Sequence, residues 1–429
     1  MEKKFTLKNN GWVKTFFLVW IGQAFSLTGS RIVQFALVWW LTDLTGSATV
    51  LATATLVALI PEILLGPIAG AYVDRWDRKR VMIVADGLIA LASLWLAYQF
   101  WAGTMQVWYV YVVMLVRSLG GMFHSPAMSA STSLMVPKEH LSRVAGANQT
   151  LHGTLAIVGA PLGALLMSLL PLHFVMMVDV GTALLAICPL LFVKIPQPAK
   201  AAASGKPASI WVDVREGIQY LRGWKGMVVI IVMAMVFKFA LTPAFSLLPL
   251  LVSQHFQGGA AEYSLIEAAS GVGMLVGGLL LSVWGGFRRK IFTCMMGISG
   301  LGLALFILGF TPPEAFRVAV GLLFFCGLMV PTVDGPLMAL LQGSIAPEMQ
   351  GRIFSLIGSL LWLTSPFSLA VAGPVSDALG LQIWYIVAGG LCVAAGVFGV
   401  LHPLIRNIES DENAPSRQPL VDGAVVAEG

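Results

Sequence analysis

Twelve long apolar stretches, separated by short polar turns, run through the sequence, and this pattern leaves few possible folds. An α-helix needs about 20 apolar residues to cross a lipid bilayer. Of the 429 residues, 57% are hydrophobic and only 11% are charged, and the mean hydropathy is +0.84. Runs that stay apolar over this length are typical of helices and not of the alternating strands of an outer-membrane barrel. We therefore predict an all-α polytopic membrane protein with twelve transmembrane helices.

The spans are predicted from the apolar runs between polar breaks. They cover residues 16–41, 48–73, 81–101, 107–134, 144–170, 173–193, 227–252, 262–284, 291–310, 315–341, 352–377 and 382–405. The basic flank before the first span resembles a signal peptide, but the apolar run is too long for a cleavable segment, so we expect a retained helix. The four cysteines lie inside apolar runs without paired spacing, so neither a disulfide nor a metal site is predicted.

The distribution of basic residues predicts the orientation. All but four of the 26 Lys and Arg residues fall in the N-terminal segment, in alternate turns and in the C-terminal tail. Basic residues accumulate in cytoplasmic loops. We therefore expect a multi-pass protein of the bacterial inner (plasma) membrane with both termini in the cytoplasm. Aromatic residues fall near the predicted outer interface, where amphipathic rings settle: Trp39, Trp40, Trp101, Trp108, Tyr109, Trp384 and Tyr385.

The longest polar break divides the spans six and six. It begins with the Pro, Ala, Lys, Ser and Gly composition of a flexible linker and continues with apolar residues at helical spacing. The C-terminal tail is polar and rich in turn residues. The predicted segments are a cytoplasmic N-terminus (1–15), a six-helix bundle (16–193), a linker with an interfacial helix (194–226), a second six-helix bundle (227–405) and a disordered tail (406–429).

The two bundles read as duplicated halves when the chain is compared with itself at an offset of 210 residues. Three matches share this frame: Arg78-Lys79-Arg80 with Arg288-Arg289-Lys290, His124-Ser125-Pro126 with Asp334-Gly335-Pro336, and Pro137 with Pro347. Because each half has an even number of spans, both begin on the same side, which makes a parallel repeat. Substrate sites in such proteins lie near the bilayer midplane between the halves.

A turn with six charges, within residues 70–80, joins the second and third spans. It resembles the loop signature G-x-x-x-D-R-x-G-R-R/K of the major facilitator superfamily. The matching residues are Gly70, Asp74, Arg75, Arg78 and Lys79, while Asp77 replaces the second glycine. Arg117-Ser118-Leu119-Gly120-Gly121 is similar to that superfamily's fourth-helix signature, and Gly159-Ala160-Pro161-Leu162-Gly163 resembles a weak form of its fifth-helix antiporter signature, with Ala160 where glycine is usual.

More narrowly, several segments resemble the bacterial macrolide-efflux branch of the drug:proton antiporters. They are Gly22-Gln23-Ala24 with residues 44–48, His124-Ser125-Pro126-Ala127, residues 277–280 and residues 351–356. The resemblance covers residues 11–405. It implies export driven by the proton gradient, a role of Arg117 in proton coupling, and an approach of Asp74 to the start of the eleventh helix at Gly351 and Arg352.

Two interpretations of the charged turn remain open. Its basic residues can serve only to anchor the topology. Alternatively, its ion pairs lock one state of a transport cycle, since partly buried pairs that differ between two rigid-body states can set their equilibrium. The candidate gating residues are Gly70, Asp74, Arg75, Arg78, Lys79 and Arg352. Gly159, Pro161 and Gly163 are candidates for close helix packing or bending, the alternative being ordinary membrane-helix usage.

Ionisable residues inside the spans are candidates for proton coupling or for the substrate cavity, because a charge there costs roughly 2.5–3.5 kcal/mol even on insertion scales. The candidates are Arg31, Glu62, Arg117, His124, Asp179, Lys238, Glu267 and Asp334. Helix depth places Arg31, Glu62, Arg117 and Lys238 near mid-membrane, Asp179 and Glu267 nearer the outside, and His124 and Asp334 nearer the inside. Each is expected to face a cavity or a partner.

Glu62 is the first choice for a proton carrier, because a low-dielectric cavity favours the neutral form of a carboxyl group. Its alternative is a structural ion pair with Arg117 or Arg31. Arg117 can likewise be a structural partner of a nearby acid, and His124 and Asp334 can serve coupling or polar packing. Some apolar side chains can line an adaptable drug pocket, although such residues more often face lipid or core: Met233, Met235, Phe237, Phe239 and Phe245.

These features predict a proton-coupled secondary transporter that exports amphipathic drugs such as macrolides by alternating access. The sequence contains no nucleotide-binding P-loop, no nucleophile elbow and no metal-spaced cluster, so we expect no enzyme activity, cofactor or metal. The expected partners are a small molecule, protons and lipid, without nucleic acid, and the chain is expected to act as a monomer. Alternatives are export of a siderophore or metabolite, lysophospholipid flipping, and, remotely, a non-transporting sensor or scaffold.

Overall fold

The computed structural model describes residues 11–73, 75–193, 195, 219, 224–345 and 347–410. Twelve helices within this part of the chain are long and apolar enough to cross a membrane, and none of the described residues forms a strand. The long helices are α1 (Gly11–Thr45), α2 (Ala48–Val73), α3 (Arg78–Trp101), α4 (Val107–Met135), α5 (Leu141–Leu169), α6 (Leu172–Phe192), α8 (Lys225–Ser246), α10 (Ala260–Trp284), α11 (Lys290–Phe310), α12 (Phe316–Ser344), α13 (Pro347–Leu379) and α14 (Gln382–Leu401). The predicted fold class is confirmed.

Two predicted spans end earlier than expected, and proline accounts for both. The seventh span stops at Ser246 and continues as the short α9 (Leu248–Leu250) and a π-helical turn, η2 (Leu251–His255). Pro243 and Pro249 lie at this break, and proline removes a backbone donor that the helix needs. The twelfth span stops at Leu401, and Pro403 begins α15 (Pro403–Arg406).

The helix bounds repeat along the chain at the offset seen in the sequence. Shifted by 210 residues, α2 would cover 258–283, and α10 covers Ala260–Trp284. Shifted likewise, α6 would cover 382–402, and α14 covers Gln382–Leu401. The halves therefore share one plan of helix lengths and turns.

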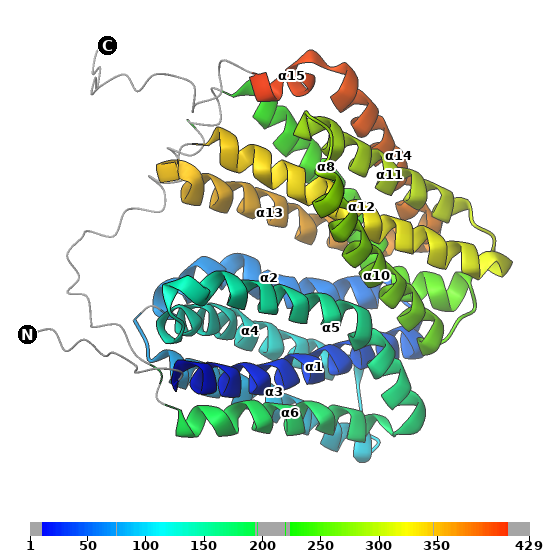
Figure 1. Cartoon of the computed structure of the whole chain (residues 1–429). Helices are drawn as coiled ribbons and strands as arrows, with labels where there is room; N and C mark the ends of the chain where they lie inside the picture. The colour runs from blue at the N-terminus through cyan, green and yellow to red at the C-terminus, as the bar shows by residue number, and fades with distance from the viewer. Residues whose placement is uncertain are drawn as a thin grey trace, which may run out of the picture.

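The helices form two groups, α1–α6 and α8–α15, which Figure 1 shows approaching each other at the right and separating toward the left, where both termini lie. Contacts between the groups hold the right-hand end. The Gln254 side chain donates to the Gly46 carbonyl at 2.6 Å, and the Thr55 and Ser246 hydroxyls lie 2.8 Å apart. The Tyr263 ring on α10 stacks on Phe35 of α1 with centroids 5.3 Å apart. These contacts lie at the helix ends opposite the termini.

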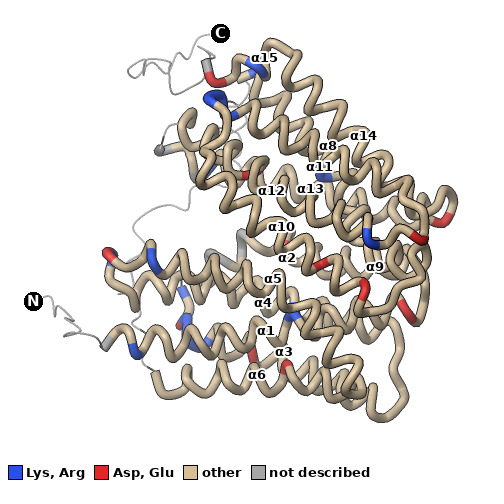
Figure 2. Tube along the Cα trace, turned by 45° about the vertical axis from the view of Figure 1, so that its right-hand side comes forward, with Lys and Arg blue, Asp and Glu red and all other residues tan. Residues whose placement is uncertain are grey.

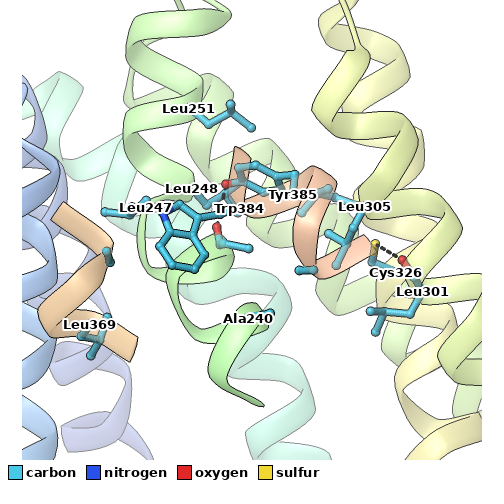
Figure 3. Packing of buried hydrophobic residues seen from close by; sticks show 14 of the residues in the cluster. Ala240, Leu247, Leu248, Leu251, Leu301, Leu305, Cys326, Leu369, Trp384 and Tyr385 are labelled. Carbon is cyan, nitrogen blue, oxygen red and sulfur yellow. Dashed lines mark hydrogen bonds between the residues drawn. The ribbon is translucent and has the colours of Figure 1, made fainter. Parts of the chain in front are cut away.

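The core of the second group is built around α14. Figure 3 shows Trp384 and Tyr385 packed beside Leu247 and Leu248, with Leu305 on the far side. The Tyr385 hydroxyl donates to the Ala244 carbonyl at 2.6 Å. The predicted aromatic belt is thus only partly at a surface. Trp101 and Trp108 are exposed, whereas other predicted belt residues are buried because they fill this core and the contact between the groups: Trp39, Trp384 and Tyr385.

The ordered chain extends further into the C-terminal tail than predicted. After α15, residues Ile408–Ser410 form a 3-10 turn, η4, whose Ile408 is 1% exposed. The Glu409 carboxylate accepts a hydrogen bond from the Ile291 amide at 2.8 Å, so it caps the start of α11. Disorder from Arg406 onward is therefore wrong for these residues, because they supply a cap that α11 lacks locally. The predicted interfacial helix and the remaining tail lie outside the described residues.

Candidate functional site

A cavity lies against the second group of helices. It has a volume of about 590 Å³, within the range of drug-sized sites. All but two of its lining residues come from α8, α11, α12, α13 and α14, and the exceptions are Thr55 and Leu59 of α2. Met233, Phe237 and Phe245 line this cavity, as expected of an apolar pocket. Met235 and Phe239 instead pack against the core.

Two charged side chains lie in this largely apolar cavity. Lys238 of α8 and Asp334 of α12 both line it and interact electrostatically. The Lys238 ammonium lies over the Trp362 ring, 4.3 Å from its centroid. A cation over an aromatic face is attracted by the ring quadrupole. The cavity therefore combines apolar walls with one basic group, one acidic group and an aromatic face.

Glu62 lies beside this cavity and not in an ion pair with Arg117. It lines an adjoining space of about 290 Å³ together with Ser359 and Trp362, and its side chain is exposed. Leu59 and Trp362 line both spaces, so the two are neighbours. The predicted carboxyl group thus faces the region between α2 and α13.

Arg31 borders a third space, of about 200 Å³, between α1, α5 and α10. Glu267 lines it too and interacts with Tyr263 and with the Arg31 charge. Gly159 and Gly163 of α5 lie against α1, where an added Cβ would meet Arg31 and Phe35 respectively. Pro161 lies between these glycines inside α5, whose helix continues through it. The absence of side chains at Gly159 and Gly163 lets α1 and α5 approach.

Arg117 belongs to a buried polar network that joins four helices. It pairs with Asp179 of α6, which is 1% exposed. The Ser93 hydroxyl of α3 donates to Asp179 at 2.6 Å and accepts from Arg117 at 3.1 Å. Ser30 of α1 donates its hydroxyl to Asp179 at 3.1 Å, and its carbonyl accepts from Arg117 at 3.0 Å. Each charge therefore has a charged partner and further hydrogen bonds, as burial requires.

Asp179 lies slightly nearer than Arg117 to the helix ends away from the termini. Arg117 lies ten residues into α4 and Asp179 seven residues into α6, both counted from the end away from the termini. This difference corresponds to about 4.5 Å along the helix axis, which the long arginine side chain spans. The two charges therefore meet although the residues lie at different depths. Neither is among the residues that line the three cavities.

His124 lies against an acid that the sequence reading missed. Its Nε2 atom is 3.5 Å from Oδ1 of Asp86 on α3, and Gln23 of α1 donates to Oδ2 at 3.0 Å. Asp86 is 4% exposed. It lies in the predicted span 81–101, where any carboxylate qualifies as a candidate by the same cost argument. It was not predicted because it lies only a few residues after the charged turn, near the end of its span.

The described residues of the charged turn make their hydrogen bonds to helices of the first group. Asp77 caps α3 by accepting from the Arg80 amide at 3.0 Å, which gives a reason for an acid where the resemblance expects glycine. The Lys79 ammonium donates to the Leu191 and Val193 carbonyls, each at 3.0 Å, at the end of α6. Figure 2 shows basic residues gathered at these helix ends near the N-terminus.

The remaining gating candidates are only partly placed. Arg75 is exposed, Arg78 is buried at the first position of α3, and Gly70 lies in the last turns of α2. Arg352 is exposed near the start of α13. Asp74 lies outside the described residues, so its predicted approach to Arg352 has no structural description.

Comparison with known proteins identifies the family. A family model described as "Transmembrane secretion effector" matches residues 12–428. The chain is 36% identical over 401 residues to "Macrolide efflux protein A" of Streptococcus pyogenes, covering 94% of this chain and 98% of that one. It is 24% identical over 386 residues to "Multidrug efflux pump Tap" of Mycobacterium tuberculosis, covering 87% and 89%.

Solved structures share the fold. A bacterial homologue of the iron transporter ferroportin, in its inward-facing state, superposes with a TM-score of 0.67 at 15% identity, covering 93% of this chain and 99% of that one. The family model, the relatives and the solved structures all indicate a membrane transporter. The chain therefore belongs to the transmembrane secretion effector family of the major facilitator superfamily, and it is a multi-pass membrane transporter and not an enzyme.

Proposed function

We propose that this transporter exports amphipathic small molecules such as macrolides in exchange for protons. The observation that carries the proposal is the 590 Å³ cavity, whose walls are largely apolar but contain Lys238, Asp334 and the Trp362 ring. An amphipathic molecule can place its apolar body against Met233 and Phe237 and its polar groups near the charged pair. The efflux proteins to which the chain is similar support export over uptake.

Both termini would lie in the cytoplasm, since basic residues gather on that side of the helices. The contacts between the two groups of helices then lie at the outer side of the membrane, and the described state faces inward. The two groups, taken as rigid halves, would rock about the cavity to expose it alternately to each side. One chain contains both halves, so a monomer suffices.

Glu62 is proposed as the proton carrier of the cavity. Its exposed carboxyl group beside Trp362 can release a proton while the space is open to water. Closure of that space would remove water and favour the neutral carboxylic acid. In an exchange cycle, the proton would bind when the cavity opens to the outside and would move inward with the neutral acid while the transporter returns without substrate. It would leave at the cytoplasmic side before the next substrate binds.

The charged turn and the helix-packing residues would serve the rocking motion. Lys79 and Asp77 tie the turn to α6 and α3, so the turn moves with the first half. Gly70, Asp74, Arg75 and Arg78 are proposed to meet the α13 end around Arg352 when the cytoplasmic side closes. Gly159, Pro161 and Gly163 keep α1 and α5 close together during that motion.

The first test replaces Glu62 by Gln. Inverted membrane vesicles from a host without other drug pumps should show uncoupler-sensitive accumulation of erythromycin with the unmodified protein. We expect Glu62→Gln to abolish this accumulation while leaving erythromycin binding measurable. Glu139→Gln, at an exposed position after α4, is the matched control and should behave as the unmodified protein.

A susceptibility panel with macrolides, dyes, siderophores and lysophospholipids, run with and without an uncoupler, tests the substrate class. Protection against macrolides alone or with dyes supports the proposal. Transport of a siderophore or a lysophospholipid alone would replace the proposed macrolide export with the corresponding alternative. Undiminished accumulation by Glu62→Gln would reject the carrier assignment.

A further inference from the structure

The cluster of Gln23, Asp86 and His124, here called the Asp86 cluster, joins α1, α3 and α4 inside the first half. Gln23 is 3% exposed, Asp86 is 4% exposed, and the His124 side chain is 14% exposed. The Asp86 carboxylate receives one hydrogen bond from the neutral Gln23 amide and faces the imidazole at 3.5 Å. The cluster is therefore almost dry and contains two titratable groups in contact.

A second polar layer lies two helical turns away on the same three helices. Ser30 follows Gln23 by seven residues on α1, Ser93 follows Asp86 by seven on α3, and Arg117 precedes His124 by seven on α4. That layer contains the Arg117–Asp179 pair, in which a basic group neutralises the acid. In the Asp86 cluster the corresponding acid has no permanent cation beside it in the described structure.

Two buried atoms of the cluster also lack hydrogen-bond partners in the described part of the chain: Oε1 of Gln23 and Nε2 of His124. A buried polar atom without a partner costs about 1–3 kcal/mol, and a buried carboxylate without a positive charge costs more. A proton held between Asp86 and His124 removes the second cost, because it makes either an imidazolium–carboxylate pair or a neutral acid. A bound proton would therefore provide the positive charge that Asp86 otherwise lacks in the described structure.

The charged groups on the surrounding helices do not replace that proton. Along α1, α3 and α4, the neighbouring charges lie at least six residues from the cluster member on the same helix. Arg80, six residues before Asp86, is exposed, and Arg117 is paired with Asp179. On α2, Glu62 faces the central region, and on α5, His152 is exposed. The charged and titratable groups on these surrounding helices are Lys14, Arg31, Glu62, Arg78, Lys79, Arg80, Arg117, Arg143, His152 and Asp179.

The fold itself does not require these residues. At the repeat offset of 210, Gln23 corresponds to Met233, Asp86 to Met296 and His124 to Asp334. The second half therefore builds the same three helices with two methionines and one acid that lines the cavity. Next to His124, Phe123 stacks on Trp76 of the charged turn, with centroids 6.0 Å apart, so the cluster borders the turn that is proposed to meet α13.

We propose that Asp86 and His124 form a second proton-binding site, inside the first half, which is loaded and unloaded during each transport cycle. This inference rests on the proposed proton coupling and adds a site distinct from Glu62. Gln23 is a positioning residue, since it holds the carboxylate toward His124.

The test uses the purified full-length chain in liposomes with erythromycin as the probe. Accumulation driven by an imposed pH gradient requires proton movement, whereas counterflow of labelled against unlabelled erythromycin does not. We expect Asp86→Asn and His124→Gln to lose gradient-driven accumulation and to retain counterflow. His152→Gln, the same change at an exposed position of the same half, should retain both.

A measurement on the unmodified chain covers the case in which the variants fold poorly. With isotope-labelled histidine, the NMR signal that disappears in His124→Gln should change protonation state when erythromycin is added, while the His152 signal stays constant. A His124 signal indifferent to erythromycin, or gradient-driven accumulation preserved in both cluster variants, overturns the proposal. If the unmodified protein shows no gradient-driven accumulation, the proposed function fails first, and the second site fails with it.

Discussion

The two halves share one plan of helices but hold their helices together by different chemistry. In the first half, Ser30, Ser93, Arg117 and Asp179 join four helices through a buried ion pair and hydrogen bonds. At the offset of 210, the second half has Ala240, Leu303, Gly327 and Gly389 at these positions. The charged network has no counterpart at its own repeat positions.

Glycine contacts take its place in the second half. A Cβ added at Gly327 of α12 would overlap the Ser270 carbonyl of α10, and one added at Gly389 of α14 would overlap the α11 backbone at Phe306. Such contacts let helices approach to backbone distance and gain dispersion energy without polar groups. The network restricts the first half to one arrangement, since each buried charge needs its partner, whereas the second half remains apolar enough to line a drug-sized cavity. Duplicated halves can thus keep one topology while one half is held together by a buried ion pair and the other by close glycine contacts.

Removing one charge of the network should have the largest effect on stability. Arg117→Leu leaves Asp179 buried without its partner, which costs about 3–5 kcal/mol. We expect a large fall in the thermal unfolding midpoint, measured in detergent with a thiol-reactive dye that reports exposure of buried Cys294, Cys326 and Cys392.

The double variant Arg117→Leu with Asp179→Leu should recover much of that loss, because no charge is left buried. A single variant as stable as the unmodified chain would show that the ion pair does not hold the first half together.

A smaller effect is expected from the glycine contacts. Gly327→Ala should lower the unfolding midpoint by an amount equivalent to about 1–3 kcal/mol, the usual cost of overpacking, because α10 and α12 must separate. Gly321→Ala on the same helix is the control, since nothing lies within 4 Å of its added Cβ. Equal unfolding midpoints for the two variants would show that close glycine contacts do not stabilise the second half.

The smallest effects should come from helix capping, where the halves again differ. Asp77 caps α3 from the adjacent turn, whereas Glu409 caps α11 from the C-terminal segment. Asp77→Ala and Glu409→Ala should each cost about 1 kcal/mol, seen as small, similar shifts of the unfolding midpoint. A shift in only one of them would mean that one cap is replaced by water or by a neighbouring side chain.

Much of the fold was predictable because apolar length is a strong signal in a membrane. The twelve spans, the repeat offset and the division into six and six helices need only the spacing of polar breaks. The break after Ser246 and the stop at Leu401 were missed because Pro243, Pro249 and Pro403 lie among apolar residues that mask them. A hydropathy pattern records the apolar run and not the lost backbone hydrogen bond.

The candidate site was predictable in its residue types but not in its pairings. The cost of intramembrane charge pointed to Lys238, Asp334 and Arg117, yet which acid meets which base depends on helix rotation. Asp86 was not predicted because it lies near the end of its span. Trp384 was assigned to a membrane interface although its side chain is buried in a core. Side-chain direction around a helix, and not its depth, decided these cases.

The remote cap on α11 sets a lower limit on how far the C-terminus can be shortened. A chain ending at Ser410 keeps Ile408 in its buried place and Glu409 on the Ile291 amide, so affinity tags or fluorescent proteins fused there need not disturb the second half. A chain ending at Leu401, where the last long helix stops, would remove both and leave the α11 start open to solvent. The useful cut site for a reporter fusion is therefore nine residues beyond the last membrane-crossing helix.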